Sequence, residues 1–313
     1  MNLPIKIELP EGFLNEEVRC GYTVNEKMKA VWAVELDLLN ELARVCSKYD
    51  INYYADGGTL LGAIRHKGYI PWDDDIDVAM FRSDYEKLCR IAKDEFITPY
   101  FFQTEYTDPS SLRGHAQLRN SYTTGILRDD FMGFHTFNQG IFIDVFPIDA
   151  VPSDDTLMEK KIHNVKKYLK SAKRLACLGS RYDYCSNPIK NIIKKLEFYC
   201  FSGTLKKYVN YKKYYQKYEE ECKTFNDNNT EKVAKFFGIP FKKNRVWYRE
   251  DFLKTENWRF EMLEIPVPIG YKRILDIFFG SDWLTPKKVD GAHSGVIFDT
   301  YTPYTKYLEE NKQ

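Results

Sequence analysis

Strand, glycine turn, helix and acidic strand follow one another between Ile51 and Phe81, and this rapid alternation constrains the fold more than any other feature. The β-prone run Ile51–Ala55 stops at the turn residues Asp56-Gly57-Gly58. Thr59 then has the chemistry of a helix N-cap for a brief helix, and Gly68 ends it. Residues Asp75–Phe81 alternate as a strand does. This order predicts a mixed α/β unit.

The flanking segments extend this unit. Apolar residues at helical spacing predict one long amphipathic helix from Asn25 to Tyr49, whose apolar stripe covers a sheet. Ser83 and Glu86 have the spacing of a capping box for a helix through Ile91. Residues Gly140–Ala150, GIFIDVFPIDA, predict another strand.

The second half has a different pattern. Residues 153–226 are helical in pattern and rich in Lys and Tyr, with a break near Pro188. Short strands are expected in Asn257–Val267 and a helix in Tyr271–Phe279. We therefore predict a catalytic core in residues 1–152, followed by a helical elaboration and a C-terminal segment in residues 153–313 that packs back on the core as part of the same globular unit.

Composition excludes several classes of protein. The 46 basic and 45 acidic residues nearly cancel, so no global field attracts nucleic acid. The seven cysteines never form a CxxC pair, which favours reduced thiols over a disulfide framework or zinc site. The start lacks a charged leader with a long apolar run, and no later stretch approaches the roughly 18–20 apolar residues of a membrane span. We expect a cytoplasmic protein.

The acidic run PWDDDIDVAM carries the most specific chemistry. Alternation along a strand turns Asp75 and Asp77 to the same face, and Asp73 joins them if the strand begins early. Carboxylates held this close repel one another unless a cation intervenes. With no His or Cys beside them, they favour magnesium or manganese, ions usually completed by substrate phosphate.

Asp144 lies within the apolar run Ile141–Phe146, where an unpartnered carboxylate would be costly. If this strand neighbours the acidic strand, Asp144 completes a three-carboxylate cluster, as a metal ligand or as the base for an attacking hydroxyl. Crowding also predicts that Asp144→Asn stabilises the metal-free protein.

Groups suited to phosphate precede the acidic strand. Gly57 and Gly58, before a helix that Thr59 opens, offer backbone N–H groups and a positive helix end. Arg65 and Lys67 add cations. Each feature alone is common, and the specific signal is their order: glycine turn, helix, basic turn, Asp-x-Asp strand and a third Asp on a later apolar strand.

This order resembles the nucleotidyltransferase superfamily, and ADGGTLLGAIRHKGYIPWDDDIDVAM (Ala55–Met80) resembles the signature of its LicD family. The similarity continues through FIDVFPIDAVP (Phe142–Pro152) and IPVPIGYKRILDIFFGSDWLTP (Ile265–Pro286). The resemblance implies metal ligation by Asp75, Asp77 and Asp144. It also implies donor-phosphate contacts by the glycine turn, extended to the two following cations: Gly57, Gly58, Thr59, Arg65 and Lys67.

The resemblance also implies an activity. LicD-type proteins transfer phosphocholine from CDP-choline to sugar hydroxyls of glycans such as teichoic acid or lipopolysaccharide and release CMP, and fukutin-type relatives transfer ribitol phosphate from CDP-ribitol. The expected partners are a CDP-activated donor and a glycan acceptor, which could be lipid-linked. The choline cation is best held by aromatic faces. Tyr53, Tyr69, Trp72 and Tyr85 are near the site in sequence, although each suits core packing equally well.

Alternatives stay open. CDP-glycerol is another possible donor. A metal-dependent Asp-x-Asp glycosyltransferase would place its nucleotide-binding strand much further upstream than the about twenty residues found here. A non-catalytic glycan-binding scaffold would be expected to lose a carboxylate, and none is missing. His293 sits among turn residues and, as a lone histidine, is interpreted as structural.

The Lys- and Tyr-rich region Ile189–Lys217 permits two interpretations. In one, a solvated basic face lies over an apolar stripe that packs on the catalytic part, formed by Ile189, Ile192, Ile193 and Leu196. In the other, the basic face meets anionic lipid head groups or a lipid-linked glycan at the inner face of the membrane.

Overall fold

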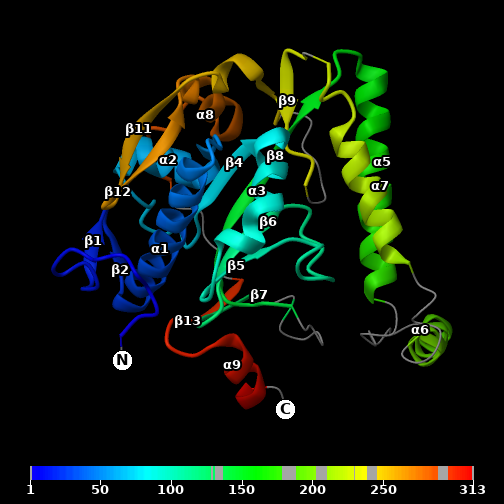
Figure 1. Cartoon of the computed structure of the whole chain (residues 1–313), viewed down its shortest axis with the longest axis horizontal. Helices are drawn as coiled ribbons and strands as arrows, with labels where there is room; N and C mark the ends of the chain where they lie inside the picture. Colours follow the sequence, from blue (N-terminus) through cyan, green and yellow to red (C-terminus); the bar gives the residue numbers. More distant parts are fainter. Residues whose placement is uncertain are drawn as a thin grey trace.

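The computed structural model describes residues 2–127, 130, 137–177, 188–201, 210–228, 230–237, 245–287 and 295–311. Figure 1 shows a central twisted sheet with helices packed around it and a separate pair of long helices at one end. The predicted α/β class is confirmed.

The central sheet is mixed and is organised by one long strand, β8 (Ile141–Val151). One edge of β8 runs parallel to β4 (Asp77–Phe81), and β4 in turn pairs with β3 (Tyr54–Ala55). The other edge is shared antiparallel by two strands, β6 (Ala116–Asn120) and β9 (Lys232–Ala234). The outer strands are β5 (Tyr100–Gln103) on β6 and β10 (Trp247–Tyr248) on β9.

Helix α1 (Glu26–Lys48) confirms the predicted amphipathic helix. The Asn25 side chain caps it by accepting a hydrogen bond from the Met28 backbone N–H. The helix packs against β8 and β6, with Trp32, Leu36 and Leu39 among its fully buried residues. Its apolar stripe therefore covers the sheet as expected.

Three local predictions are wrong in detail. Helix α2 (Gly57–His66) begins two residues before Thr59, and Asp56 occupies its N-cap position, because Gly57 adopts a φ of +50° that few other residues tolerate. Helix α3 (Arg82–Glu95) has Phe81 at its N-cap position, so Ser83 lies inside the first turn and forms no capping box; Glu86 pairs with Lys223 instead. Strand β4 begins at Asp77, so Asp75 precedes it.

A second hydrophobic cluster lies between α5 (Asp155–Cys177), α7 (Tyr211–Lys223) and the end of the sheet. Val165 and Leu169 of α5 are buried in it with Tyr215 and Tyr218 of α7. Figure 1 shows the two helices lying side by side at one end of the molecule.

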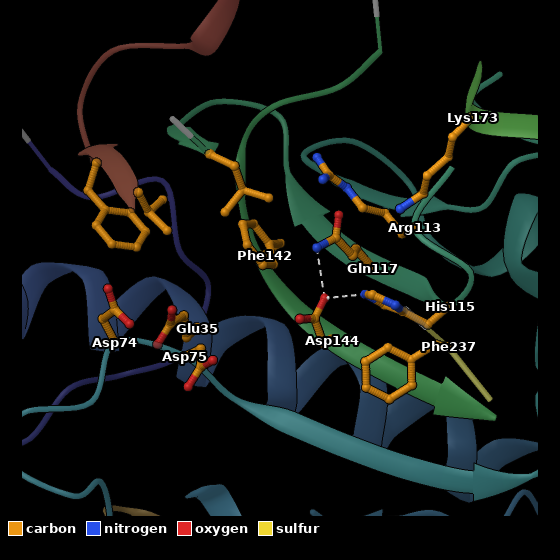
Figure 2. Close-up of a pocket in the computed structure, with 13 residues that line it drawn as sticks. Glu35, Asp74, Asp75, Arg113, His115, Gln117, Phe142, Asp144, Lys173 and Phe237 are labelled. Atoms are coloured by element: carbon orange, nitrogen blue, oxygen red, sulfur yellow. Dashed lines mark hydrogen bonds and ion pairs between the residues drawn. The ribbon is translucent and has the colours of Figure 1, made fainter. Parts of the chain in front are cut away.

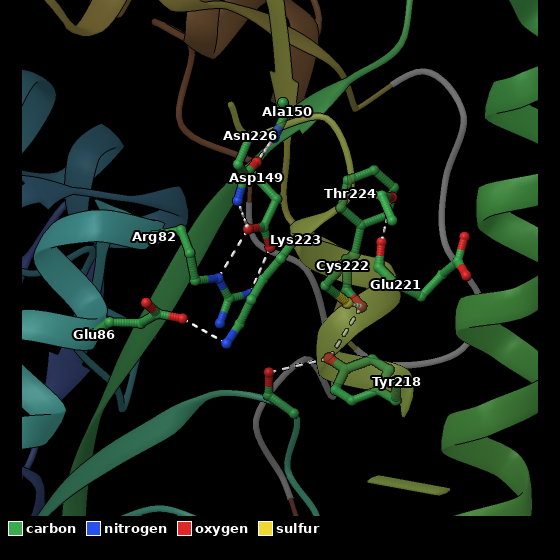
Figure 3. Close-up of polar contacts among 12 residues, drawn as sticks. Arg82, Glu86, Asp149, Ala150, Tyr218, Glu221, Cys222, Lys223, Thr224 and Asn226 are labelled. Atoms are coloured by element: carbon green, nitrogen blue, oxygen red, sulfur yellow. Dashed lines mark hydrogen bonds and ion pairs between the residues drawn. The ribbon is translucent and has the colours of Figure 1, made fainter. Parts of the chain in front are cut away.

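Polar contacts join this helical pair to the sheet (Figure 3). Arg82 of α3 forms a buried two-point ion pair with Asp149 of β8, and Asn226, after α7, donates to the same carboxylate. Lys161 of α5 donates hydrogen bonds to three backbone carbonyls at 2.8–2.9 Å, those of Ala150, Cys222 and Thr224. The helical elaboration is therefore tied to β8 through side chains whose charges are paired or solvated by carbonyls.

Helix α6 (Pro188–Phe201) is set apart from the sheet in Figure 1. Its apolar stripe is 52–70% exposed, at Ile189, Ile192, Ile193 and Leu196. The prediction that this stripe packs on the catalytic part is therefore wrong. Lys206, Lys207 and Tyr208 lie outside the described residues.

The C-terminal segment packs back on the core, as predicted. The hairpin of β11 (Thr255–Phe260) and β12 (Leu263–Pro268) confirms the expected short strands, and it is preceded by a 3-10 helix, η2 (Arg249–Phe252). Helix α8 (Tyr271–Phe279) packs on α2. Strand β13 (Val296–Asp299) pairs with β7 (Thr124–Leu127).

Helix α9 (Tyr304–Asn311) follows β13, and a small hairpin, β1 (Glu17–Arg19) and β2 (Tyr22–Val24), precedes α1. Within the described ranges, no helix combines the length and apolarity needed to cross a bilayer. Free thiols are found at Cys20, Cys46, Cys89, Cys200 and Cys222; of these, Cys46 and Cys222 are buried and Cys20 and Cys200 are exposed.

Candidate active site

Asp77 and Asp144 are direct neighbours on the paired parallel strands β4 and β8. The pairing continues one residue before β4, where the Asp144 backbone N–H donates to the Ile76 carbonyl at 2.9 Å. The expectation that the Asp144 strand neighbours the acidic strand is thus confirmed. Asp75 precedes β4 and lines the same cavity as Asp144.

The glycine turn makes room for this acidic cluster. A Cβ on Gly57 would lie 3.2 Å from Asp77 Oδ2, and one on Gly58 would lie only 2.5 Å from Asp73 Oδ2. Asp73 and Asp77 therefore sit against the N-terminal end of α2, where the helix dipole favours negative charge. Carboxylate oxygens of Asp73, Asp74 and Asp75 lie within 4.8 Å of one another, close enough to share one cation.

The two paired aspartates have opposite electrostatic surroundings. Burial raises the pKa of Asp77 well above its usual value, and the charges of Asp75, Asp144 and Asp73 raise it further. Burial also opposes ionisation of Asp144, but His115 and Gln117 more than offset this, so the pKa of Asp144 is lowered. The charged form is therefore disfavoured at Asp77 and favoured at Asp144.

His115 and Gln117 orient Asp144, and sequence reasoning missed both. Gln117 Nε2 donates to Asp144 Oδ1 at 2.7 Å, and His115 Nε2 lies 3.1 Å from the same oxygen. Figure 2 shows the other Asp144 oxygen pointing away from His115, toward the acidic side of the cavity. The sequence did contain a signal for them: His115 and Gln117 alternate with Ala116 and Leu118 as residues on one face of a strand do.

Glu35 is a second residue that sequence reasoning missed. It is buried on α1, accepts a hydrogen bond from the Tyr69 hydroxyl at 2.9 Å, and lines the cavity beside Asp74 and Asp75. Burial, more than the three nearby aspartates, raises the pKa of Glu35 well above its usual value. The signal was an acid inside the apolar stripe of a helix.

A cavity of about 310 Å³ with an acidic and a basic end is lined by Asp144, His115 and Gln117, but not by Asp77 (Figure 2). Glu35, Asp74 and Asp75 lie on one side, and Arg113 and Lys173 on the other. Arg113 also pairs with Asp130. Phe142 and Phe237 contribute apolar walls, together with Leu127, Val296 and Phe298 from β7 and β13. Such a cavity suits a ligand that brings both a cation and phosphate oxygens.

The structure brings only part of the predicted phosphate-binding set to the carboxylates. Gly57 and Gly58 lie beside them, and the Thr59 hydroxyl accepts a hydrogen bond from the Asp77 backbone N–H at 2.8 Å. Arg65 instead donates to the Trp283 carbonyl at 2.6 Å. Lys67 ends α2, which at 1.5 Å per residue places it about 15 Å from Gly57. Phosphate contacts by these residues stay predictions.

The aromatic residues near the site in sequence belong mainly to the core. Tyr53, Tyr69 and Tyr85 are buried, and Tyr69 stacks on Trp32 with ring centroids 4.4 Å apart. Trp72 packs edge-on against Tyr22. His293 lies outside the described residues.

Comparison with known proteins identifies the family. Residues 50–177 match the model for the LicD/FKTN/FKRP nucleotidyltransferase domain. The chain is 31% identical over 263 residues to the lipopolysaccharide cholinephosphotransferase LicD of Haemophilus influenzae, covering 82% of this chain and 91% of that protein. The chain belongs to the LicD family. It is also 42% identical over 84 residues to the ribitol 5-phosphate transferase FKRP of Mus musculus, covering 23% of this chain and 17% of that protein.

Membership of the LicD family makes this chain a phosphotransferase. The residues matched by the family model include the glycine turn, the acidic run, Asp144 and its partners His115 and Gln117. The C-terminal segment beyond the family model packs against α2 through α8. The family model thus covers the part of the fold that builds the carboxylate cluster.

Proposed function

We propose that this LicD family protein transfers phosphocholine from CDP-choline to a hydroxyl of a cell-surface glycan, such as teichoic acid or lipopolysaccharide, and releases CMP. The observation that carries the proposal is the match to a lipopolysaccharide cholinephosphotransferase over 91% of that protein's length. The match to the ribitol 5-phosphate transferase spans 17% of its length and supports ribitol phosphate as the second candidate.

We infer that the reaction uses magnesium or manganese held by Asp75, Asp77 and Asp144. The donor set fits, because burial and neighbouring carboxylates disfavour the charged form of Asp77 without a cation, and all three proposed ligands offer hard carboxylate oxygens. When bound, the cation would neutralise the donor diphosphate and the charge that develops during transfer. Asp73 and Asp74 lie close enough to Asp75 to act in its place or beside it.

The remaining polar side chains of the cavity orient the Asp144 carboxylate and supply positive charge for the substrate phosphates. His115 and Gln117 fix the direction of the Asp144 carboxylate, which acts as a ligand or accepts the proton of the acceptor hydroxyl. Arg113 and Lys173 place positive charge at the opposite end, where an anionic donor or acceptor phosphate would bind. Catalysis would then rest on positioning and electrostatic stabilisation.

Two other classes of function fit less well. An Asp-x-Asp glycosyltransferase does not account for the strand pairing of Asp77 with Asp144 within the LicD family domain. A glycan-binding scaffold has no need for a crowded carboxylate cluster, which costs stability in the absence of a cation.

The experiment is a donor screen. CDP-choline, CDP-ribitol, CDP-glycerol and CDP-ethanolamine are each incubated with the protein, magnesium and a glycan acceptor, and CMP release is measured. CDP-choline should give the fastest release, and chelation with EDTA should stop it. Faster release from CDP-ribitol would favour the second candidate, and no release from any donor would contradict the proposal.

We further propose that the protein works at the inner face of the membrane, where a lipid-linked acceptor would be found, and that α6 makes the contact. Its exposed apolar stripe lies between lysines of the same helix, which include Lys190, Lys194 and Lys195. A helix with one apolar face and flanking lysines suits the boundary between acyl chains and anionic head groups.

A further inference from the structure

A buried ion pair borders the carboxylate cluster at the N-terminal end of α2. Lys235, just after β9, is 9% exposed, and its ammonium group donates a hydrogen bond to Asp56. Asp56 immediately precedes Gly57. A Cβ on Gly57 would lie 3.2 Å from Asp77 Oδ2 and 3.8 Å from Phe278 Cζ, so the pair is next to the proposed metal site.

Four aromatic rings surround the Lys235 ammonium group. Its Nζ lies 4.7 Å from the ring centroid of Phe146, 5.4 Å from Trp247, 5.5 Å from Phe278 and 5.6 Å from Phe237. These rings come from β8, β10, α8 and the segment after β9. All four distances fall within the range of a cation–π contact, and cages of this kind bind quaternary ammonium groups. We call Phe146, Phe237, Trp247, Phe278 and Asp56 the cation cage.

A comparison within the chain distinguishes this lysine from one that is purely structural. The buried Lys161 donates to three backbone carbonyls at 2.8–2.9 Å, which uses all its hydrogen-bonding capacity. Among the described residues, Lys235 instead meets one carboxylate and the faces of rings. Its surroundings therefore suit a cation that cannot donate hydrogen bonds better than they suit an ammonium group.

Two more observations connect the cation cage to a ligand. Phe237 also lines the cavity that holds Asp144, and it stacks on Phe146 with centroids 4.2 Å apart, so the cage and the cavity share a wall. The Trp247 indole Nε1 is buried and has no hydrogen-bond partner among the described residues. Buried donors in folded proteins are nearly always paired, so this N–H calls for an acceptor such as an oxygen of the same donor molecule, because a trimethylammonium group cannot accept a hydrogen bond.

We propose that the cation cage binds the trimethylammonium group of the donor, and that Lys235 occupies the cage as an internal substitute until the donor enters. This inference rests on the proposed function and assigns the head group of that substrate to a place. The exchange conserves charge: the choline cation replaces Lys235 beside Asp56, and the released ammonium group can pair with the phosphate of the same donor. No covalent bond changes in this step.

The first test removes the internal substitute. Lys235→Met leaves Asp56 buried without a cation, so the variant should be stabilised by an added cation that fits the cage. Thermal unfolding is measured with choline chloride, with its neutral carbon isostere that carries a tert-butyl group, and with sodium chloride at equal ionic strength. Choline should raise the Tm of the variant by about 2 °C or more at concentrations well above its Kd, and the wild type by less. Equal effects of choline and the isostere, or no effect of choline, would overturn the proposal.

The second test does not require the first variant to fold. Phe278→Leu removes one ring of the cage but keeps apolar bulk, and Phe279→Leu changes the next ring, which is exposed and is not among the described rings around Lys235. Phe278→Leu should raise the KM for CDP-choline about tenfold and leave the KM for CDP-ribitol or CDP-glycerol within twofold, whereas Phe279→Leu should change neither. If Phe278→Leu raised the KM for every donor, or for no donor, the proposal that the cation cage binds the choline group would be overturned.

The two proposals fail separately. Choline binding needs no turnover, so a protein that binds choline through the cage but releases no CMP from CDP-choline contradicts the proposed function alone. CMP release that is equally efficient in Phe278→Leu and wild type, with no choline effect on Lys235→Met, contradicts the cage alone.

Discussion

Asp77 and Asp144 are paired across two strands but differ in what surrounds them. Burial and the neighbouring carboxylates raise the pKa of Asp77, whereas His115 and Gln117 stabilise the charge of Asp144 and lower its pKa. The prediction that Asp144→Asn stabilises the metal-free protein is therefore wrong in its residue, and the stabilised variant should be Asp77→Asn. The charged form of Asp77 is therefore disfavoured unless a proton or a cation neutralises it.

For activity, Asp77→Asn should abolish metal-dependent CMP release while the fold stays intact, because charge is removed and shape is kept. Asp94→Asn, an exposed position on α3, is the matched control and should retain wild-type turnover. Turnover of Asp77→Asn within about tenfold of the wild type would argue against metal ligation by this residue.

For stability, the same variant should be more stable than wild type in EDTA at pH 8, by about 1 kcal/mol or more. Because the folded-state pKa of Asp77 is raised, the folded wild type binds a proton that the unfolded chain has released, and its stability falls as the pH rises above about 4 through the folded pKa. The difference between variant and wild type should vanish near pH 4. Urea unfolding between pH 4 and pH 8 measures the stability of wild type, Asp77→Asn and Asp144→Asn. If Asp144→Asn gained as much stability as Asp77→Asn, Asp77 would not be the carboxylate whose charge destabilises the metal-free protein.

Position 58 needs glycine because there is no room for a Cβ atom, and not because the backbone adopts a positive φ there. A Cβ there would lie 2.5 Å from Asp73 Oδ2, so Gly58→Ala should displace the Asp73 carboxylate and cost roughly 1–3 kcal/mol of stability with a marked loss of turnover. Gly295→Ala, with nothing within 4 Å of the new Cβ, should be neutral. Thermal unfolding and CMP release measure both effects, and wild-type behaviour of Gly58→Ala would contradict the packing argument.

At the scale of elements, α6 is the helix whose environment differs most from expectation. Its apolar residues are exposed while those of α5 and α7 are buried against each other. An ion pair between Arg174 and Glu197, at 3.9 Å, connects it to α5, which is a weak contact at such exposed positions. The apolar stripe of α6 is exposed at Ile189, Ile192, Ile193 and Leu196, so it can meet a surface.

The prediction for α6 is salt-dependent membrane binding. The protein should sediment with anionic vesicles at low salt and be released as ionic strength rises. Replacing Lys190, Lys194 and Lys195 by glutamine should weaken binding roughly hundredfold, at about 1 kcal/mol per lysine, without changing CMP release in the absence of acceptor. Glutamine at Lys212 and Lys213, which are exposed on α7, is the control. Equal sedimentation of the two variants would exclude α6 as the contact.

At the scale of the whole molecule, the segment after α7 meets the sheet at the buried ion pair that Arg82 of α3 forms with Asp149 of β8 (Figure 3). Asp149 also accepts from Asn226, so removing its carboxylate leaves a buried guanidinium group without a partner. Because β8 carries both Asp149 and Asp144, this joint and the candidate site share one strand.

Asp149→Ala should therefore destabilise the protein by about 3–5 kcal/mol. Glu86→Ala removes an ion pair with Lys223 that is partly exposed on both sides and should cost less than about 1 kcal/mol. Urea unfolding of both variants gives the comparison, and similar losses in the two would refute a special role for the buried pair.

The sequence by itself determined the elements whose patterns are local. The stripe of α1, the apolar run of β8 and the helix α8 before Gly280 were all predictable, because burial periodicity and capping residues act within a few residues of one another. The acidic run before β4 was recognisable for the same reason, and metal ligation by its aspartates stays a prediction. Helix starts were less predictable, because α2 begins at Gly57, with a φ of +50°, before Thr59, and α3 begins at Arg82, before the capping signal of Ser83 and Glu86.

Only the tertiary structure decided which distant side chains meet. Strand pairing set Asp77 opposite Asp144, packing of α1 brought Glu35 to the acidic run, and four separate elements placed rings around Lys235. A sequence pattern reports whether a side chain is buried but not what it is buried against, because the partner is set by long-range packing. The same reason left the apolar stripe of α6 exposed, although its pattern matches that of a helix in the core.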